Sequence, residues 1–414
     1  MLRSVVAILA AAVAVALFSG AVAAEQPALS WTYPVGSYVS GAPLPWGNML
    51  IVGAWNGNLF EIYTNTGQPQ WAFRAEGDIR AGATANGNVL YFATSAGNIY
   101  AVDGWTGLQL WKYQANASID CTPLVYNGLL LVGADDGTIY ALNAATGALL
   151  WNFTSGGVVS SDLDVAANTL YFGSQDGNVY AVDTTSGTAR WKAPLQARAY
   201  APAVYKNTIY VGADDGNLYA LDPVSGSVLW TYRLGDRTVA KPLCQSGRVY
   251  VSSLDGNLYA LDSTSGKLAW KFNATYPLRA PPAFDGGIIY AGCGNDTRGL
   301  VYAIDGRFGL PYWSYQTDSS VEGAPAISGG HVLFASLKGT VYSLALPSPD
   351  TLVLITPTPA ATQKPAATPT ATPTPTATPV PPVSPSPSPA PLEPLLGLFA
   401  LAAGAVSASA FRRR

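Results

Sequence analysis

Eight tryptophans recur at a nearly constant interval, and this spacing constrains the fold more than any other feature of the chain. The seven gaps between them are 40, 40, 40, 40, 39, 40 and 43 residues. A set of glycines keeps the same interval. The tryptophans are Trp31, Trp71, Trp111, Trp151, Trp191, Trp230, Trp270 and Trp313, and the glycines are Gly57, Gly97, Gly137, Gly177, Gly216, Gly256, Gly299 and Gly339. A period near forty residues indicates one supersecondary unit that is copied and stacked on itself.

Each unit has the pattern of four short β-strands. The copy from Thr122 to Phe153 runs TPLVYNG, LLLVGADDG, TIYALNAATG and ALLWNF. These segments are rich in β-branched, aromatic and leucine residues, and they are separated by Asn-Gly, Asp-Gly and Thr-Gly, which favour hairpin turns. No helical periodicity of useful length is found between Glu25 and Leu346. Four antiparallel strands in forty residues are typical of one blade of a β-propeller.

The number of first strands predicts eight blades. These strands lie near Pro43, Ala83, Pro123, Leu163, Pro202, Pro242, Pro282 and Pro325. The last copy holds only three strands, whereas Trp31 precedes any complete copy. We therefore predict that Leu29–Tyr33 supplies the missing fourth strand and closes the ring. The predicted fold is all-β, an eight-bladed propeller of four-stranded antiparallel blades over residues 25–346.

The first 24 residues have the pattern of a secretory signal peptide. Arg3 precedes an apolar run from Val5 to Phe18, and Val22–Ala24 offers a small-residue cleavage site. Ser19-Gly20 favours cleavage over retention as an uncleaved anchor. We therefore expect an extracytoplasmic protein. Four N-x-[ST] sequons are candidate glycosylation sites that suit such a location: Asn116, Asn152, Asn273 and Asn295.

The composition changes sharply after Leu346. Residues 347–394 are dominated by Thr, Pro, Ala and Ser. Proline at this density prevents helix and sheet, and Thr and Ser with Pro predict a disordered, O-glycosylated stalk. Residues 395–411 are apolar and precede Arg412–Arg414. We predict an apolar C-terminal helix over 395–414. It is either a transmembrane anchor with its arginines on the cytoplasmic side, or a processed sorting signal that begins near Leu392-Glu393-Pro394.

Charge and cysteine content narrow the classes of partner. Charged residues make up 11% of the chain and the net charge is −3, which argues against a nucleic-acid partner. The three cysteines are too few for a disulfide framework. Either Cys244 and Cys293, which lie in neighbouring repeats, form a pair, or these two and Cys121 are small buried apolar residues.

Two copies of the repeat show a nearly complete consensus. Asp215–Trp230 and Asp255–Trp270 both follow D-G-N-L-Y-A-L-D-x-x-[ST]-G-x-x-x-W. This pattern resembles the quinoprotein-type, or pyrroloquinoline-quinone-like (PQQ-like), propeller repeat, and the resemblance extends from Leu29 to Leu346. It implies that each repeated tryptophan docks against the neighbouring blade and that a glycine permits the close approach. A tryptophan buries a large apolar area and a glycine tolerates positive φ, so we expect the eight tryptophans to be structural.

The resemblance implies two classes of function. One branch contains dehydrogenases that use pyrroloquinoline quinone with Ca²⁺, and the other contains scaffolds such as the lipoprotein of the bacterial outer-membrane assembly machine and extracellular sensor modules. The dehydrogenase branch implies adjacent cysteines, a tryptophan floor, Ca²⁺ ligands and a catalytic Asp. This chain has no Cys-Cys pair and only Trp46, Trp55 and Trp105 outside the repeat position. We therefore expect neither the quinone nor calcium as a cofactor, and a protein nearer the scaffolds.

No catalytic or metal-binding set is predicted. His331 is the only histidine, so the chain lacks the second histidine of a usual zinc site. No Ser/His/Asp set can be assembled around a histidine this isolated. Asp135, Asp214 and Asp255 lie in separate repeats and read as hairpin-turn residues, whereas Ca²⁺ needs six to eight converging oxygens.

The candidate binding site is a charged rim. The residues just before the first strands should ring the central funnel, and they are Ser40, Arg80, Asp120, Ser160, Ala199, Val239, Arg279 and Glu322, with Asp162 and Lys241 one or two positions further on. Charges gathered at one mouth of a charge-poor protein suggest a polar binding rim. We take Arg80, Asp120, Asp162, Lys241, Arg279 and Glu322 as its charged members, and Trp55 as a further member. The alternative is that these are solvated loop ends that pair across blades.

The turns between second and third strands should face the same side and add Trp55, Asp135, Gln175 and Asp214. An exposed Trp55 would be a usual interface residue, and the alternative is that it packs on the adjacent loop. The sequence thus predicts a monomeric, surface-anchored propeller that binds an envelope protein or ligand. Two alternatives stay open: a reduced quinone- and calcium-dependent oxidoreductase, and a carbohydrate-binding adhesin suggested by Trp55 and the many tyrosines.

Overall fold

A computed structural model describes residues 26–347 and Leu352. The predicted signal peptide, the C-terminal segment 395–414 and all of the predicted stalk except Pro347 and Leu352 lie outside the described residues. Within the described part, no helix has the length and apolarity needed to cross a bilayer.

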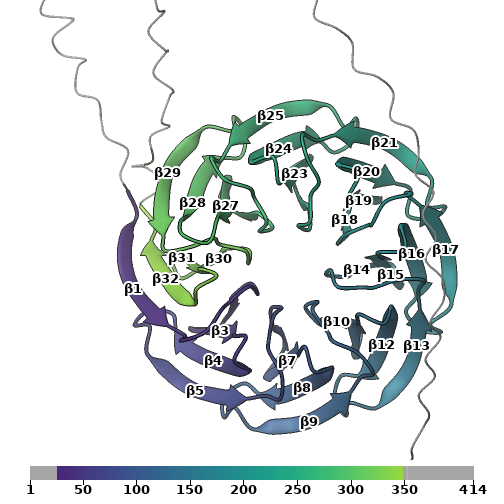
Figure 1. Ribbon diagram of the computed structural model, residues 1–414, viewed down its shortest axis with the longest axis horizontal. Coiled ribbons are helices and arrows are strands. Elements are labelled where there is room, and N and C mark those ends of the chain that lie inside the picture. The colour runs from purple at the N-terminus through teal and green to yellow at the C-terminus, as the bar shows by residue number, and fades with distance from the viewer. Residues whose placement is uncertain (1–25, 348–351, 353–414) are drawn as a thin grey trace, which may run out of the picture. The chain divides into compact units, whose positions relative to one another are not determined.

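The described residues form eight four-stranded antiparallel sheets arranged as blades around a ring, as predicted (Figure 1). The first four blades are β2 (Leu44–Trp46), β3 (Met49–Gly53), β4 (Asn58–Tyr63), β5 (Pro69–Arg74); β6 (Thr84–Asn86), β7 (Val89–Ala93), β8 (Asn98–Asp103), β9 (Gln109–Gln114); β10 (Leu124–Tyr126), β11 (Leu129–Gly133), β12 (Thr138–Asn143), β13 (Leu149–Thr154); and β14 (Asp164–Ala166), β15 (Thr169–Gly173), β16 (Asn178–Asp183), β17 (Ala189–Pro194).

Blades 5 to 8 continue the same order. They are β18 (Ala203–Tyr205), β19 (Thr208–Gly212), β20 (Asn217–Leu221), β21 (Val228–Arg233); β22 (Leu243–Gln245), β23 (Arg248–Ser252), β24 (Asn257–Asp262), β25 (Leu268–Asn273); β26 (Ala283–Asp285), β27 (Ile288–Gly294), β28 (Gly299–Asp305), β29 (Pro311–Thr317); and β30 (Ala326–Ser328), β31 (His331–Ala335), β32 (Thr340–Ala345) with β1 (Ala28–Pro34).

The N-terminal strand closes the ring. The last sheet has the order β1-β32-β31-β30, so β1 is its outermost strand. Its antiparallel register pairs Ala28 with Ala345 and Pro34 with Thr340. Figure 1 shows the purple β1 beside the yellow-green β32. The predicted clasp around Leu29–Tyr33 is therefore confirmed.

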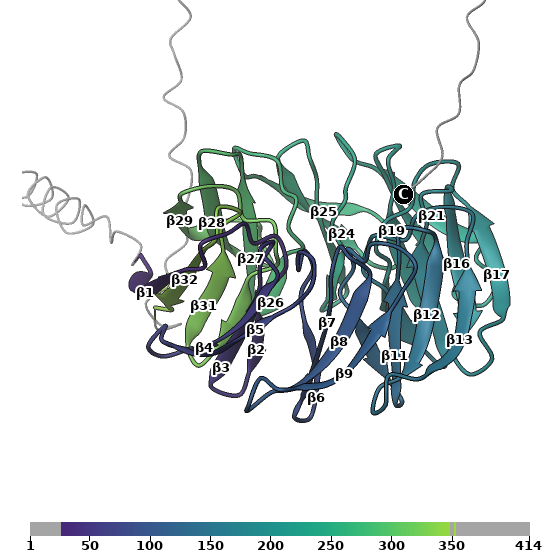
Figure 2. The ribbon, with the colours of Figure 1, turned by 60° about the horizontal axis from the view of Figure 1, so that its bottom comes forward.

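The strand order gives the propeller two unlike faces (Figure 2). One carries the turns between second and third strands (2–3 turns) and the loops that lead from each fourth strand to the next first strand. We call it the loop face. The other, the turn face, carries the turns between first and second strands and between third and fourth strands (3–4 turns). Because β1 starts and β32 ends on the turn face, the described chain enters and leaves the ring there.

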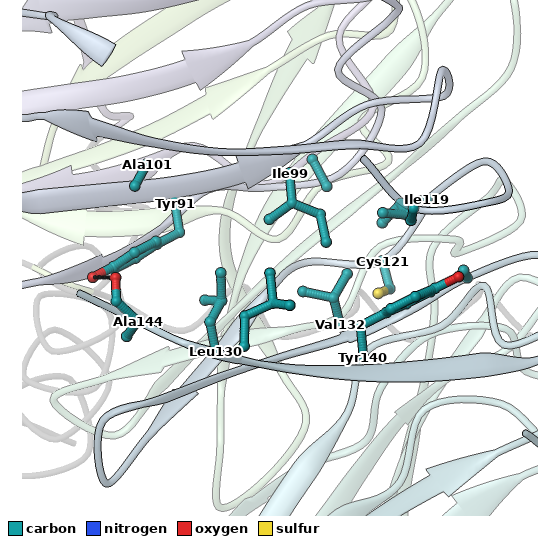
Figure 3. Close-up of a cluster of buried hydrophobic side chains, with 13 residues drawn as sticks. Tyr91, Ile99, Ala101, Ile119, Cys121, Leu130, Val132, Tyr140 and Ala144 are labelled. Atoms are coloured by element: carbon teal, nitrogen blue, oxygen red, sulfur yellow. Dashed lines mark hydrogen bonds between the residues drawn. The ribbon is translucent and has the colours of Figure 1, made fainter. Parts of the chain in front are cut away.

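The core lies between blades rather than within them. Figure 3 shows one such layer, in which Ile99 and Ala101 of blade 2 pack against Leu130 and Val132 of blade 3. All four residues are fully buried. Second and third strands are buried on both faces because each blade lies between two others, whereas fourth strands alternate between half-buried and exposed residues. Burial between neighbours makes the ring depend on every seam.

The repeated tryptophans dock as the resemblance implied. Seven donate their indole N–H to a carbonyl in the 3–4 turn of the next blade, at 2.8–3.3 Å. Their acceptors, in order, are Thr64, Gly104, Ala144, Thr184, Pro223, Ser263 and Gly306. Trp313 is the exception.

The glycine at this contact is not the one in the predicted set. A Cβ on Gly57 would lie 2.9 Å from the Ala75 carbonyl oxygen, which belongs to its own blade. The indole rings instead cover a glycine of the 3–4 turn, in the pairs Trp31–Gly67, Trp71–Gly107, Trp111–Gly147, Trp151–Gly187, Trp191–Gly226, Trp230–Gly266 and Trp270–Gly309. These turn glycines supply the close approach.

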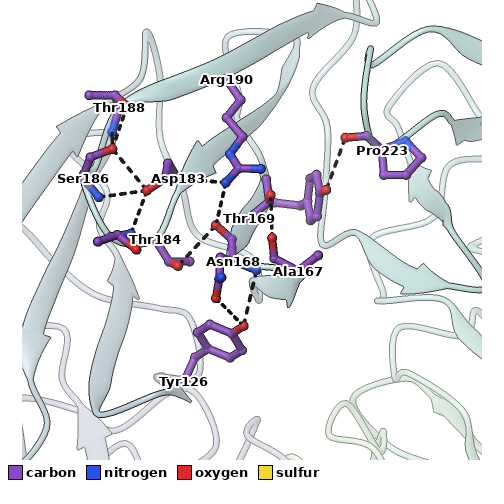
Figure 4. A network of polar contacts seen from close by, with 12 residues as sticks. Tyr126, Ala167, Asn168, Thr169, Asp183, Thr184, Ser186, Thr188, Arg190 and Pro223 are labelled. Atoms are coloured by element: carbon purple, nitrogen blue, oxygen red, sulfur yellow. Dashed lines mark hydrogen bonds and ion pairs between the residues drawn. The ribbon is translucent and has the colours of Figure 1, made fainter.

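A carboxylate holds the 3–4 turn in shape (Figure 4). In blade 4, Asp183 accepts hydrogen bonds from the backbone N–H groups of Thr185 and Ser186, both at 2.9 Å. Arg190 donates to the other carboxylate oxygen at 2.6 Å and lowers the pKa of Asp183. The consensus Asp of D-x-x-[ST]-G is therefore a turn residue that presents the glycine to the indole.

Candidate functional site

A polar cavity of about 270 Å³ lies on the loop face, where the starts of the eight first strands converge. Small residues permit this convergence. A Cβ on Gly41 would lie 2.4 Å from the Ala81 carbonyl carbon, and one on Gly323 would lie 2.6 Å from the Gly41 oxygen. The innermost backbones are thus in contact, and the longer side chains at these positions project into the mouth.

All six charged residues of the predicted rim line this cavity: Arg80, Asp120, Asp162, Lys241, Arg279 and Glu322. Ser40, Ser160 and Val239 line it as well. Ala199 does not, because it forms a β-bridge with Ala213 and is buried. The sequence missed Tyr200, which takes that place and whose hydroxyl donates to Asp214 at 2.6 Å. The gap from Trp191 to Trp230 is 39 residues instead of 40. This shortening was the signal in the sequence that the rim position of blade 5 is shifted by one residue.

Arg80 is held from three sides. Its guanidinium lies 3.1 Å from Asp78 and 3.5 Å from Asp120, and 5.2 Å from the ring centre of Trp55. Asp162, in contrast, is in no ion pair within the described part of the chain, and it accepts a hydrogen bond from the Thr122 backbone at 2.9 Å. The carboxylates of blades 3 and 4 are therefore only partly neutralised.

The cations of blades 6 and 7 are also paired with carboxylates. The Lys241 ammonium reaches past blade 5, where small Ala201 leaves room, to lie 3.4 Å from Asp164, and it donates to the Leu163 carbonyl at 3.0 Å. The Arg279 guanidinium lies 4.0 Å from Glu322. Burial raises the pKa of Glu322, and Arg279 opposes this shift.

The charged residues of the rim therefore pair across blades, which is the alternative that the sequence left open. Arg80 lies beside Asp120, Lys241 beside Asp164 and Arg279 beside Glu322. Burial raises the pKa of Asp135, in the 2–3 turn of blade 3, and the nearby Asp120 raises it further. A partner that carries charges of both signs can compete for these partly exposed pairs.

Trp55 lines a second depression. Its indole N–H donates to Ser40 at 2.8 Å, and the Ser40 hydroxyl donates to the Arg80 carbonyl at 2.7 Å. Trp55 thus packs on the neighbouring loop. With Tyr38, at 5.5 Å between ring centres, it forms one wall of a hollow of about 440 Å³ completed by Asp296, Ser319, Leu337 and Lys338. The other non-repeat tryptophans, Trp46 and Trp105, pack against each other on the turn face, with ring centres 4.6 Å apart and ring planes tilted by 50°.

The remaining predicted residues have structural surroundings. The four sequon asparagines are exposed. His331 Nδ1 lies within hydrogen-bond distance of Ser343 Oγ (2.9 Å) and Ser30 Oγ (3.3 Å), where it joins blade 8 to the clasp strand.

The structure decides between the two interpretations of the cysteines. All three cysteines fall in the described part and are free thiols. Cys293 donates to the Ala274 carbonyl at 3.2 Å and Cys121 to the Gly133 carbonyl at 3.2 Å. Cys244 packs between blades 5 and 6 and Cys293 between blades 6 and 7, so the two side chains lie in different layers.

Eight four-stranded blades, joined by a repeated tryptophan–glycine contact, define a PQQ-like repeat propeller. Residues 62–202, 197–278 and 254–347 match the family described as outer membrane protein assembly factor BamB. The chain belongs to this family. No functionally curated protein matches it.

Solved structures share the fold. BamB from Moraxella catarrhalis has a TM-score of 0.66 and 21% identity, covering 78% of this chain and 98% of that one. The computationally designed Ika8 protein has a TM-score of 0.70 and 20% identity, over 78% and 100%. The quinohemoprotein alcohol dehydrogenase of Comamonas testosteroni has a TM-score of 0.66 and 16% identity, over 80% and 79%. Identities this low show the fold alone.

The quinone cofactor of the dehydrogenase branch carries three carboxylates. In this cavity they would meet three carboxylates, Asp120, Asp162 and Glu322, and three cations, Arg80, Lys241 and Arg279. In residues 26–347, no three His, Cys, Asp or Glu side chains are grouped closely enough to hold a metal ion. The geometry supports binding through charge pairs and hydrogen bonds.

Proposed function

We propose that this protein is a non-enzymatic binding module tethered at the cell surface, whose loop face engages an envelope protein. The observation that carries the proposal is the convergence of six charged residues from six blades on one cavity mouth, in a chain with only 11% charged residues. Membership of the BamB-like family supports a protein-binding scaffold. Charged rims set partner choice and association rate more than raw affinity.

The end of the described chain leaves the loop face free for this use. β32 ends on the turn face, so Leu346 and Pro347 lie on the side opposite the cavity.

Site-specific photocrosslinking in the native host tests the proposal. A photoreactive residue replaces Tyr200 or Val239 on the cavity, and Thr185 or Ser225 on the turn face as matched exposed controls. We expect one defined adduct from the cavity positions that weakens when Lys241→Gln and Arg279→Gln are combined and persists with Arg190→Gln. Adducts from the turn face alone would reject the loop face as the binding surface.

A second candidate function rests on the hollow beside Trp55. Two aromatic rings next to Asp296 and Lys338 offer stacking and hydrogen-bonding groups of the kind that hold a sugar. Glycan-array binding by the described propeller, lost with Tyr38→Ala and retained with Lys241→Gln, would support an adhesin. An array without signal would remove this candidate and leave the first intact.

A further inference from the structure

One repeated hydrogen bond is missing. Seven of the eight repeat tryptophans donate to a 3–4 turn carbonyl, but among the described residues nothing accepts the indole N–H of Trp313. Its side chain is the most enclosed of the set, with 1% exposure. A buried donor without an acceptor is unfavourable, so such groups in native proteins call for a partner.

The way in which the ring closes explains why Trp313 lacks this hydrogen bond. Trp313 belongs to blade 7 and should dock on the 3–4 turn of blade 8. Blade 8 has no such turn, because its fourth strand is β1. In a complete blade one carbonyl serves two donors: Gly306 accepts from Trp270 at 3.2 Å and from Tyr250 at 3.0 Å.

Tyr290 occupies the position in blade 7 that Tyr250 holds in blade 6. Its ring lies 5.9 Å from that of Trp313, as Tyr250 lies 5.7 Å from Trp270. No hydrogen-bond partner for its hydroxyl is found in the described part, and burial raises its pKa. The Trp313 indole N–H and the Tyr290 hydroxyl thus lie at the place where a 3–4 turn of blade 8 would offer its carbonyl.

A cavity of about 330 Å³ occupies this place. It lies between blades 7 and 8 and is lined by Asp285, Tyr290, Trp313, Gly330, Leu346 and Leu352. A suitable occupant offers a backbone carbonyl for the two donors and aliphatic side chains for the apolar walls. An extended peptide segment has both.

The sequence that follows β32 contains such a segment. Leu352-Val353-Leu354-Ile355 is the only run of large aliphatic residues between Pro347 and Pro394, where Thr, Pro, Ala and Ser otherwise prevail. Leu352 packs against the buried cluster that contains Trp313 and Tyr290. Four consecutive aliphatic residues are out of place in a solvated stalk, and the first of them is already in the cluster.

We propose that residues 353–358 of the chain's own tail bind in this cavity, and that one of their backbone carbonyls accepts the Trp313 indole N–H in place of the missing 3–4 turn. The tail then acts as a second closure of the ring, beside β1. This proposal is independent of the function of the loop face.

Indole hydrogen exchange in the full chain, labelled with ¹⁵N-tryptophan, tests it. The chain has 11 tryptophans, and Trp313→Phe assigns the relevant signal. We expect Leu354→Asp with Ile355→Asp to speed exchange of the Trp313 indole about tenfold, because the displaced segment loses a hydrogen bond and apolar burial. The Trp270 indole, bonded to Gly306, should not change.

Matched controls separate this effect from a general one. Val380→Asp with Val383→Asp alters the same tail further along and should leave every indole unchanged. The proposal would be overturned if the exchange rate of the Trp313 indole did not change in the variant with Leu354→Asp and Ile355→Asp. An effect that grows with protein concentration would also overturn it, because a second copy's tail would then fill the cavity.

Discussion

The indole of Trp31 covers the α-carbon of Gly67 across the seam where the propeller closes. Trp31 lies on β1 of blade 8 and Gly67 in the 3–4 turn of blade 1, and a Cβ on the glycine would lie 2.6 Å from Trp31 Cδ2. The indole N–H donates to the Thr64 carbonyl at 2.8 Å. The first and last blades are thus held by the same contact that joins other neighbours.

Gly67→Ala should open this seam. Gly67 has φ +70° and its Cβ would meet the indole, whereas Gly47 has φ +60° and nothing within 4 Å of a Cβ. Gly47→Ala therefore reports the backbone cost alone, about 1 kcal/mol, and Gly67→Ala should cost about 2 kcal/mol more through displacement of Trp31. Chemical denaturation of both variants measures the difference. Equal losses would mean that Trp31 moves aside freely.

The shared carbonyls predict similar effects of removing two tyrosine hydroxyls. Tyr210→Phe deletes a buried hydrogen bond to Ser263 at 2.8 Å and should lower the free energy of unfolding by about 1 kcal/mol. Tyr290→Phe should lower it by about the same amount, because the proposed tail carbonyl accepts from Tyr290 as well as from Trp313. Urea midpoints of the two variants measure both losses. No loss at Tyr290 would mean that the carbonyl does not serve its hydroxyl.

Glu61 should make stability depend on pH. It is fully buried at a position where six blades carry alanine and blade 8 serine, and neither carboxylate oxygen has a partner within the described residues. Burial raises the pKa of Glu61 from 4.5 to about 7. Between these values the unfolded chain releases its proton while the folded chain keeps it. The free energy of unfolding should therefore fall by about 3 kcal/mol as pH rises through this window.

Glu61→Gln isolates the contribution of Glu61 to the pH dependence of the free energy of unfolding. Denaturation curves at several pH values should show the fall in the wild type and a smaller fall in the variant, because Gln does not titrate. Parallel pH profiles for the two proteins would assign the dependence to other groups.

The Arg279–Glu322 pair of the rim predicts that the pKa of Glu322 depends on Arg279. Burial raises the pKa of Glu322, and Arg279, 4.0 Å away, holds part of that rise in check. Arg279→Gln should raise the pKa of Glu322 further, whereas Arg190→Gln on the turn face should not. Carboxyl NMR titration measures both. A fall in the Glu322 pKa on loss of Arg279 would mean that the pair is not in contact in solution.

The thiols should resist alkylation. Burial raises the pKa values of Cys121, Cys244 and Cys293 to about 12, so few thiolates exist near neutral pH. Native protein should react slowly with iodoacetamide, and denatured protein should expose three thiols. A disulfide-linked peptide containing Cys244 and Cys293 in non-reducing mass spectrometry would contradict the free-thiol state.

Local pattern was enough to predict the ring. Turn glycines and strand residues such as those of Asp255–Trp270 act within one repeat, and counting Trp31 apart from the complete copies predicted the clasp. The rim could be placed for the same reason, because the residue before each first strand has a fixed position in its blade.

Contacts between repeats could not be predicted from the sequence. Gly57 and Gly67 recur with the same period, so spacing alone could not tell which glycine meets the indole. The burial of Glu61 depends on a neighbouring blade. The fate of Trp55 depended on whether Ser40 and Arg80 come close enough to hold it, which only the packed ring shows.

The pairing of β1 with β32 also sets an order of events during synthesis. Ser30 and His331 meet although 301 positions separate them, so the first strand to be made is the last to find its partner. Until then blade 8 has an open edge that can pair with another chain. Contacts this distant in sequence slow folding. Assembly of the ring therefore finishes only when nearly all of the propeller has been made, and an incomplete chain is the species most exposed to misassembly.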